Sequence, residues 1–400
     1  MTGAGLVADE LANRFLVNCL SSRRDPDSLR KAAMIMEGQP STYWERVWQL
    51  ADSGRIAPLV YHVTRDTGLL PQWLRARCQT AYMETGILNA LRLRELALLV
   101  GVLDGNGIPV ILLKGVALAE NIYGNVGLRP MVDTDILVQR RHVAAALAVL
   151  QRCGYRQVGM EITPGATLAY ENEILLRKEG TSVGQIELHW SLFDSPYYQM
   201  RLPETAIWET AVSIALEDRT AFQLSPEWTL LHLCGHLAFH HHGTGLLWWN
   251  DVAELLYRYT NRIQWPEVMV QAQAAHLTLA LKFVLLTAAD IWLAPVPRDV
   301  IEHLRSLEPT VDELSVGQEL MATGRSPGAR LLRDARVINS WPERVRFFYH
   351  NLVPSAAYID ERYQIKHPSL RPFYYFYRWL IGLYGLLRGP SDRREKGNIQ

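Results

Sequence analysis

The segment 108–138 decides the fold, and its sequence is IPVILLKGVALAENIYGNVGLRPMVDTDILV. Its first six residues form a short apolar run rich in β-branched side chains, which is typical of a buried strand. Lys114 and Gly115 end this run, and helical spacing of apolar residues follows as far as Tyr123. Residues 131–138 then alternate apolar and polar side chains, which indicates a second strand. The segment therefore predicts a strand, a glycine turn, a helix and another strand.

Two further alternating runs follow this segment. Residues 168–177 and 183–189 each alternate apolar and polar side chains, and the segment Lys-Glu-Gly-Thr-Ser between them contains a turn-forming glycine. The two runs therefore predict a β-hairpin. Helical spacing dominates the rest of the chain. We predict a mostly helical α+β protein, with a small mixed β-sheet core over residues 104–202 between helical regions over 1–103 and 203–400.

Composition narrows the class of protein. The chain has 400 residues, of which 48% are hydrophobic and 20% charged, and this excludes a disordered protein. Lysine plus arginine and aspartate plus glutamate both number 41, so no net charge favours a nucleic-acid partner. The four cysteines are scattered without metal-site spacing, which fits a reducing compartment. No basic leader or long apolar run is present in the sequence, so we expect a cytoplasmic protein with no transmembrane segment.

Three carboxylates form the candidate site. Asp133 and Asp135 are two residues apart in a predicted strand, so both side chains are expected on one face. Neighbouring carboxylates raise each other's pKa, and a bound cation relieves this repulsion. Glu187 shares the polar face of a later strand with His189. Carboxylates on adjacent strands form an all-oxygen set that suits Mg²⁺ or Mn²⁺, and the predicted metal ligands are Asp133, Asp135 and Glu187.

Lys114 and Gly115 lie where the first predicted helix of this core begins. The free N–H groups and the positive end of the helix dipole form an anion site at such a position. A triphosphate bridged by metal ions would fit between this helix start and the carboxylates.

The order of these residues resembles the DNA polymerase β-type nucleotidyltransferase superfamily, whose pattern is a Gly-Ser turn, an Asp-x-Asp strand and a distal acid. Within that superfamily, the chain is similar to a bacterial nucleotidyltransferase family. The motifs that carry the resemblance lie within residues 108–190 and are Leu113-Lys-Gly115, Tyr123, Arg129, Asp133-x-Asp135-x-Leu137-Val138, Gly154-Tyr155 and Glu187-x-His189-Trp190. One departure is Val116, which stands where the superfamily usually has serine. A phosphate contact through that hydroxyl is absent, so Lys114 or main-chain amides must replace it.

The resemblance implies a transferase that binds ATP or another NTP and moves a nucleoside monophosphate to an acceptor hydroxyl. Asp133 and Asp135 would hold two Mg²⁺ or Mn²⁺ ions, and Glu187 would complete the second site or act as the base. The nucleotide-binding residues would be Lys114, Gly115 and Arg129. The helical region 203–400 would bind the acceptor, and a small molecule, sugar or peptide is favoured over nucleic acid.

Several residues keep two interpretations at this stage. His189, His236 and Asp251 are possible acceptor contacts or supports for the metal ligands. Asp251 is equally well explained as the N-cap of a helix, and Arg129 as the anchor of its own loop through a carboxylate.

Two other features keep alternatives open. The histidines at 232, 236 and 240 recur every four residues, as in a zinc site, but the glutamate of an HExxH motif is missing, which favours cleft lining or packing. The aromatic and basic segment 371–388 is expected to dock on the protein, with binding to a membrane surface as the alternative. A non-catalytic nucleotide- or peptide-binding module and a histidine-centred metallohydrolase therefore remain as alternatives to the transferase.

Overall fold

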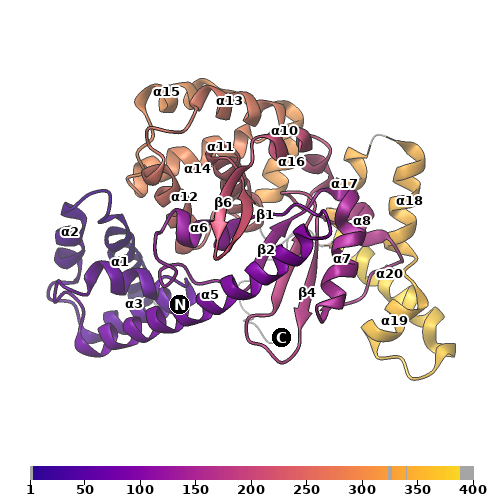
Figure 1. Cartoon of the computed structure of the whole chain (residues 1–400), viewed down its shortest axis with the longest axis horizontal. Coiled ribbons are helices and arrows are strands. Elements are labelled where there is room, and N and C mark those ends of the chain that lie inside the picture. Colours follow the sequence, from indigo (N-terminus) through magenta and orange to yellow (C-terminus); the bar gives the residue numbers. More distant parts are fainter. Residues whose placement is uncertain (1–2, 323–326, 339, 388–400) are drawn as a thin grey trace.

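A seven-stranded mixed β-sheet lies at the centre of the part of the chain that the structure describes (Figure 1). The computed structural model describes residues 3–322, 327–338 and 340–387. The strand order is β3-β4-β5-β2-β1-β7-β6, in which β2 is parallel to β5, β1 is parallel to β7, and the other neighbours are antiparallel. The strands are β1 Ile111–Leu112, β2 Thr134–Leu137, β3 Tyr155–Gln157, β4 Glu173–Lys178, β5 Gln185–His189, β6 Val212–Leu216 and β7 Arg219–Gln223. The chain is mostly helical around this sheet, as expected for the α+β class.

Side-chain alternation divides the sheet between two hydrophobic cores. Ile136, Ile186 and Leu188 point to the core that includes α5 (Gln72–Asp104) and α7 (Val143–Arg152). The residues that alternate with them therefore point to the opposite face. That face carries the polar side chains of the candidate site.

The predicted order of strand, glycine, helix and strand is confirmed. It consists of β1, α6 (Lys114–Asn121) and β2. The β4–β5 hairpin is also confirmed, with Glu173 opposite His189. The first predicted run is too long, because residues 168–170 belong to the helix α8 (Ala166–Tyr170) and the strand begins at Glu173. The extent of β2 differs from the prediction, because the strand begins at Thr134. Asp133 therefore lies in the loop before β2 and not within the strand.

The N-terminal region is helical, as predicted. Its helices are α1 Gly3–Ser21, α2 Asp27–Met36, α3 Ser41–Ser53, α4 Ala57–Thr64 and α5. The long helix α5 runs along one side of the sheet, and α1–α4 gather at its N-terminal end (Figure 1). Two side chains of α5 hold the loop before β2: the Asn89 amide donates to the carbonyl of Arg129, and Arg92 donates to the carbonyl of Val132. The helical region thus fixes the loop that carries Asp133.

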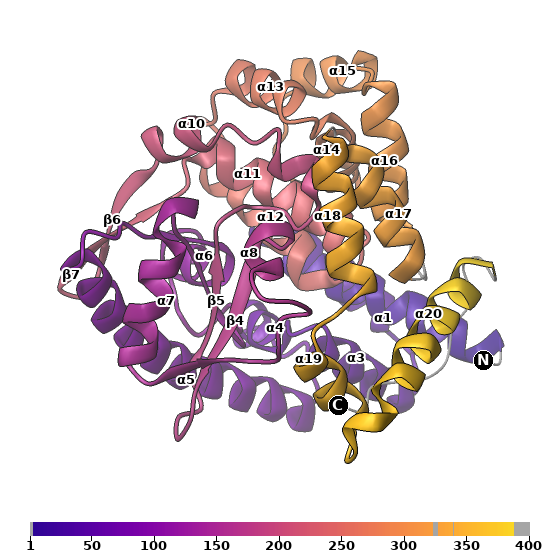
Figure 2. The same ribbon diagram turned by 90° about the vertical axis from the view of Figure 1, so that its right-hand side faces the viewer.

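The C-terminal half covers the other side of the sheet and then extends beyond it (Figure 2). Its elements before residue 323 are α9 Pro196–Gln199, α10 Glu204–Glu209, α11 Pro226–Gly235, the π-helix η2 His236–His240, α12 Leu246–Arg258, α13 Trp265–Ala274, α14 Thr278–Ile291, α15 Arg298–Ser306 and α16 Val311–Met321. The later elements are α17 Pro327–Val337, α18 Trp341–Leu352, α19 Ala356–Tyr363, η3 Pro368–Leu370 and α20 Arg371–Leu387. The remaining short elements are η1 Arg140–His142 and α8 Ala166–Tyr170, and Tyr170 of α8 packs against Phe347 of α18.

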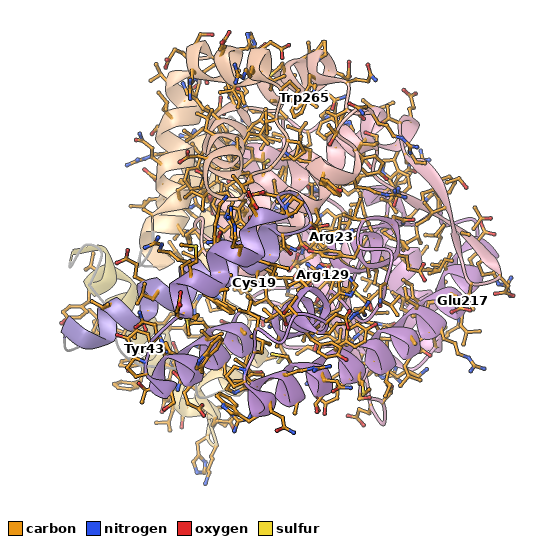
Figure 3. All side chains as sticks on the ribbon, turned by 90° about the vertical axis from the view of Figure 1, so that its left-hand side faces the viewer. Cys19, Arg23, Tyr43, Arg129, Glu217 and Trp265 are labelled. Carbon is orange, nitrogen blue, oxygen red and sulfur yellow. The ribbon has the colours of Figure 1, made fainter. Side chains whose placement is uncertain are left out.

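The helical region expected over residues 203–400 also contains two strands that were not predicted, because β6 and β7 complete the sheet there. These strands form a hairpin whose turn holds Glu217 at φ 52. Glu217 lies at the outer tip of this hairpin (Figure 3). Hairpin turns usually have glycine or asparagine at a position with positive φ. This turn has Glu217 there, so the sequence carries no glycine or asparagine signal for the hairpin.

The aromatic helix α20 docks on the protein through one face only. Arg371 forms an ion pair with Asp360, and the Tyr375 hydroxyl donates to the carbonyl of Pro354. Phe373 and Phe376 remain 63% and 57% exposed, so the expected docking covers only part of the helix. Among the described residues, no helix is long and apolar enough to cross a membrane.

Candidate active site

The register of three adjacent strands creates the polar site. Asp135 of β2 lies beside Glu187 of β5, and His189 of β5 lies opposite Glu173 of β4. All four side chains line one cavity on the face of the sheet away from the Ile186 core. A slip of one residue in β5 would turn apolar side chains toward the cavity, so the observed register is the one the site requires.

His189 connects the three acidic side chains. Its Nε2 lies 3.0 Å from Oδ1 of Asp135 and 3.6 Å from Oε2 of Glu187. Its Nδ1 lies 3.0 Å from Oε2 of Glu173. The imidazole is almost fully buried, so these contacts fix its orientation.

Lys114 reaches the same carboxylates from the start of α6. Its Nζ donates to Oδ1 of Asp135 at 2.7 Å and lies 3.6 Å from Oε2 of Glu187. The backbone of Lys114 has φ 45, a left-handed conformation that costs free energy in a residue with a side chain. This strained position marks the junction at which β1 ends and the helix begins.

Gly115 is required by close packing at this junction. A Cβ atom at this position would lie 2.6 Å from Nη1 of Arg129 and 2.8 Å from Cγ of Met131. Any larger side chain would therefore displace the loop that leads to β2. The glycine lets α6 and that loop approach each other.

Burial and neighbouring charges shift the pKa values of the site residues. Burial opposes the charged form of Asp135, but Lys114 and His189 outweigh it and hold the pKa of this carboxyl well below its usual range. Burial and the Lys114 charge disfavour a protonated His189, yet Glu173 and the hydrogen bonds to Asp135 and Glu173 raise its pKa to about 10. Burial raises the pKa of Glu187, and the charges of Asp135 and Glu173 act in the same direction. Glu187 is therefore the carboxylate in this group that is best prepared to accept a proton.

One group of donor atoms fits a metal ion among the residues that the structure describes. It consists of carboxylate oxygens of Asp135 and Glu187 and a ring nitrogen of His189, all within 4.8 Å of one another. Asp133 lines the same cavity from the preceding loop but is not part of this group. Burial and the charge of Asp135 raise the pKa of Asp133. The donor set therefore contains an imidazole, where the sequence predicted only oxygen ligands.

Arg129 and Asp251 form a buried ion pair at the edge of the cavity. Nη2 of Arg129 lies 2.8 Å from Oδ2 of Asp251, and Nε lies 3.2 Å from Oδ1. The Tyr123 hydroxyl donates to the same Oδ1 at 2.7 Å. Arg129 lies near the middle of the view in Figure 3. Asp251 lies within α12, whose N-cap is Gly245, so the interpretation of Asp251 as a helix cap is wrong.

The histidines around His236 line the cavity from the C-terminal half. The π-helix η2 widens the helical turn, and the rings of His236 and His240 stack at 4.9 Å. His241 Nε2 lies 3.0 Å from His236 Nε2. Burial lowers the pKa of His236, His240 and His241, so these rings are uncharged at neutral pH. Within the described residues, the histidines at 232, 236 and 240 form no three-ligand metal group, and His232 lies outside the cavity lining.

The cavity between the sheet and the C-terminal helices has a volume of about 460 Å³. The carboxylates lie on its sheet side, and uncharged rings, including His236, Phe239 and Trp248, line the side of the C-terminal half. Its size is in the range of small-molecule binding sites. The cavity can therefore hold a metal-bound anion next to a group with an aromatic or polar surface.

Comparison with known proteins identifies the family of this chain. The model of the uncharacterised nucleotidyltransferase family matches residues 40–292. The chain belongs to this family. The matched region contains the entire strand register that forms the carboxylate site, and it also contains α3, α4 and the π-helix η2.

Among solved structures, this nucleotidyltransferase family member is similar to an antigenic nucleotidyltransferase-like protein from Paracoccidioides brasiliensis. The two chains share 18% sequence identity with a TM-score of 0.37, over 53% of this chain and 96% of the other. No curated protein matches the chain.

Glu173 is the main site residue that the sequence analysis missed. It lies in the predicted run 168–177, but no motif distinguishes it from the other polar residues of that run. Only the pairing of β4 with β5 identifies Glu173, because the antiparallel register places its carboxylate directly opposite His189. Positions of this kind are found from a predicted register and not from local sequence.

Proposed function

We propose that this member of the uncharacterised nucleotidyltransferase family transfers a nucleoside monophosphate from an NTP, ATP among the candidates, to an acceptor hydroxyl. The observation that carries the proposal is the donor group of Asp135, Glu187 and His189, which lies next to Lys114 at a helix start in the cavity. The order of these elements supports membership of the DNA polymerase β-type superfamily. A cytoplasmic location is part of the proposal.

The proposed metal ligands are Asp133, Asp135 and Glu187, with Mg²⁺ or Mn²⁺ as the ions. The carboxylates of Asp135 and Glu187, whose oxygens belong to a donor group within 4.8 Å, fit a divalent cation. Such ions, when bound, neutralise phosphate oxygens and make an acceptor hydroxyl more acidic. Asp133 lines the cavity beside this group, where burial and the charge of Asp135 raise its pKa and a bound cation would offset both.

In the proposed reaction, an acceptor oxygen forms a bond to the α-phosphorus while the bond from that phosphorus to the pyrophosphate oxygen breaks. Where Glu187 acts as the base and not as a metal ligand, the hydroxyl proton moves to its carboxylate, and the raised pKa of Glu187 favours this transfer. Lys114 now contacts Asp135, and from this position its ammonium group is able to turn toward the phosphates. Main-chain N–H groups at the start of α6, after Gly115, add hydrogen-bond donors.

Arg129 supports the nucleotide site indirectly in this proposal. Its guanidinium is already paired with Asp251, so it holds the loop before β2 against α12. His236 and Asp251 lie on the cavity side formed by the C-terminal half, where the acceptor would bind. A small molecule, sugar or peptide fits a cavity of this volume better than a folded nucleic acid does.

The departure at Val116 does not weaken the proposal. The Val116 side chain is buried in the core on the opposite face of the sheet, so it does not point into the cavity. Main-chain groups and Lys114 are therefore the donors on this helix that an anion would meet.

The test is Mg²⁺-dependent NTP binding and turnover by the full chain. ATP, GTP, CTP and UTP are each titrated by calorimetry with Mg²⁺ and again with EDTA. Pyrophosphate release is followed with candidate acceptors, and the mass of the protein itself is checked for a bound nucleotide. We expect binding only with Mg²⁺, because the carboxylates repel a bare triphosphate. Equal binding in EDTA would contradict the proposal.

A matched pair of variants separates the site from the rest of the hairpin. Glu187→Gln removes the proposed base and is expected to reduce turnover by at least ~100-fold. Glu179→Gln changes an exposed glutamate in the turn of the same hairpin and should leave turnover unchanged. Similar turnover in both variants would remove Glu187 from the mechanism.

A further inference from the structure

Arg55 brings a cationic side chain to the cavity from the N-terminal helices. It lies in the turn between α3 and α4 and is an exposed residue that also lines the cavity wall. Arg55 and His241 line the same cavity, and the positive charge of Arg55 contributes to lowering the pKa of His241, after burial and the charges of His240, Lys114 and His242. His241 in turn lies 4.4 Å, centroid to centroid, from the Trp248 ring. Arg55 therefore belongs to the wall opposite the sheet.

The other lysine and arginine side chains of the cavity already have partners. Lys114 contacts Asp135 at 2.7 Å, and Arg129 contacts Asp251 at 2.8 Å. Arg330 contacts Asp194 at 2.5 Å. For Arg55, the described part of the chain supplies no ion pair or side-chain hydrogen bond. An anion that enters the cavity can bind Arg55 without breaking an existing ion pair.

The backbone holds Arg55 in this position. Its φ is 55, in the left-handed region that residues with side chains adopt rarely. The Arg55 N–H donates to the carbonyl of Asp52, and the next residue, Ile56, is fully buried and anchors the chain. The conformation thus fixes the backbone position from which the Arg55 side chain extends.

Charge compensation identifies the anion. Carboxylates outnumber lysine and arginine side chains in the cavity, so a nucleoside triphosphate needs positive charge beyond what the site now leaves free. Metal ions at the sheet side would compensate the phosphate that reacts. The two terminal phosphates, which leave as pyrophosphate, need a further cation on the other side of the cavity. A guanidinium suits this role because its planar N–H groups bind phosphate oxygens in pairs.

We propose that Arg55 binds the terminal phosphates of the nucleoside triphosphate and the pyrophosphate that leaves. This inference rests on the proposed nucleotidyl transfer and adds a specific binding residue to it. Arg55 contacts the leaving part of the substrate and not the acceptor. The N-terminal helices thus contribute to the nucleotide site, and their position relative to the sheet determines how the triphosphate binds.

The test compares Arg55→Gln with the unmodified full chain. Calorimetry measures the binding of three ligands, each in a separate titration. They are magnesium pyrophosphate, the NTP that the unmodified chain binds most tightly, and the nucleoside monophosphate that corresponds to this NTP. Loss of a charge-assisted hydrogen-bond pair is expected to weaken pyrophosphate and NTP binding by roughly 10- to 100-fold. Binding of the monophosphate should remain within about twofold, because it lacks the terminal phosphates.

Two further variants and one control complete the experiment. Arg55→Lys keeps the charge but not the paired N–H groups, so its affinity should lie between those of Arg55→Gln and the unmodified chain. Arg55→Gly removes the charge and relieves the left-handed backbone, so it folds at least as stably and should bind as weakly as Arg55→Gln. Arg75→Gln changes an exposed arginine of α5 outside the cavity and should have no effect.

The outcomes separate this inference from the proposed function. If the unmodified chain binds NTP and pyrophosphate and Arg55→Gln binds them equally well, Arg55 has no phosphate role and the proposed function stands. An equal loss of monophosphate binding would place Arg55 at another part of the nucleotide and overturn the assignment. If the unmodified chain binds neither NTP nor pyrophosphate, both proposals fail.

Discussion

The guanidinium of Arg129 and the carboxylate of Asp251 form a two-point ion pair between residues 122 positions apart in the sequence. Both side chains are buried, and the Tyr123 hydroxyl completes the coordination of Asp251. The pair joins the loop before β2 to helix α12. It therefore holds the C-terminal half against the part of the sheet that carries the candidate site.

Asp251→Asn is expected to lower the free energy of unfolding by about 3–5 kcal/mol, because Arg129 would remain buried without its counter-charge. Urea unfolding followed by circular dichroism measures the change. The control is Asp66→Asn, which breaks an exposed ion pair with Arg65 and should cost less than about 1 kcal/mol. Equal effects of the two substitutions would show that the Arg129–Asp251 pair does not anchor the loop.

The two aspartates of the Asp-x-Asp motif should respond in opposite ways to neutralisation. Asp133 has a raised pKa, so its charge is unfavourable in the folded state and Asp133→Asn should leave the melting temperature level or higher. Asp135 has a strongly lowered pKa, and Asp135→Asn would remove the closest carboxylate from Lys114 and one of the two carboxylates that lie 3.0 Å from His189. That change should cost about 3 kcal/mol or more.

Both substitutions should reduce turnover by at least ~100-fold, since both residues are proposed metal ligands. Calorimetric scans and NTP turnover on the same samples separate stability from activity. Simple repulsion between two carboxylates would predict a rise in melting temperature for both variants. That result would mean that Lys114 does not neutralise Asp135 in solution.

Gly115→Ala should destabilise the chain by about 1–3 kcal/mol, because the added methyl group would overlap Arg129 and Met131. Gly382→Ala is the matched control, since a Cβ atom at this position in α20 meets no atom within 4 Å. The control should be neutral or more stable by about 0.4–1 kcal/mol, because alanine lowers the entropy of the unfolded chain. Thermal unfolding of both variants measures the two changes in stability. If Gly115→Ala is as stable as the unmodified chain, the loop before β2 can move to accept the methyl group without a loss of stability.

Local sequence patterns were sufficient for the elements that form the centre of the site. The apolar run before Lys114, the glycine after it and the alternation around Glu187 correctly predicted β1, α6 and β5. Alternation also placed Glu187 on the polar face, since Ile186 and Leu188 are fully buried on the other. These predictions depend only on the spacing of apolar and polar side chains within one short segment.

The remaining features depend on contacts between distant segments. His189 contacts Asp135 because β5 pairs in parallel with β2, and no sequence pattern sets that register. The Arg129–Asp251 pair requires α12 to pack beside the loop before β2. The strand β6 was missed although Val212, Ile214 and Leu216 alternate with small residues. Its side chains are mostly exposed, and its place at the edge of the sheet depends on pairing with β7.

The buried His232 should make stability depend on pH in a predictable direction. Burial, Lys114 and His189 lower the pKa of His232 to about 3, and Asp135 and Glu173 only partly oppose this. The unfolded chain takes up a proton on this residue near pH 6.5, and the folded chain does not. The contribution of neutral His232 is therefore complete above pH 6.5 and is lost as the pH falls toward 3, with a loss of about 2 kcal/mol at pH 5.

His232→Leu should remove this part of the pH dependence. The Nε2 atom of His232 has no hydrogen-bond partner within the described structure, so leucine breaks no bond at that atom. Urea unfolding at pH 7.5 and pH 5 should show a stability loss smaller by about 2 kcal/mol in the variant than in the unmodified chain. His367→Leu, which changes an exposed histidine, should keep the original loss. If the loss of stability between pH 7.5 and pH 5 is the same in His232→Leu as in the unmodified chain, His232 takes up its proton in the folded chain. The prediction that His232 stays neutral when buried would then be wrong.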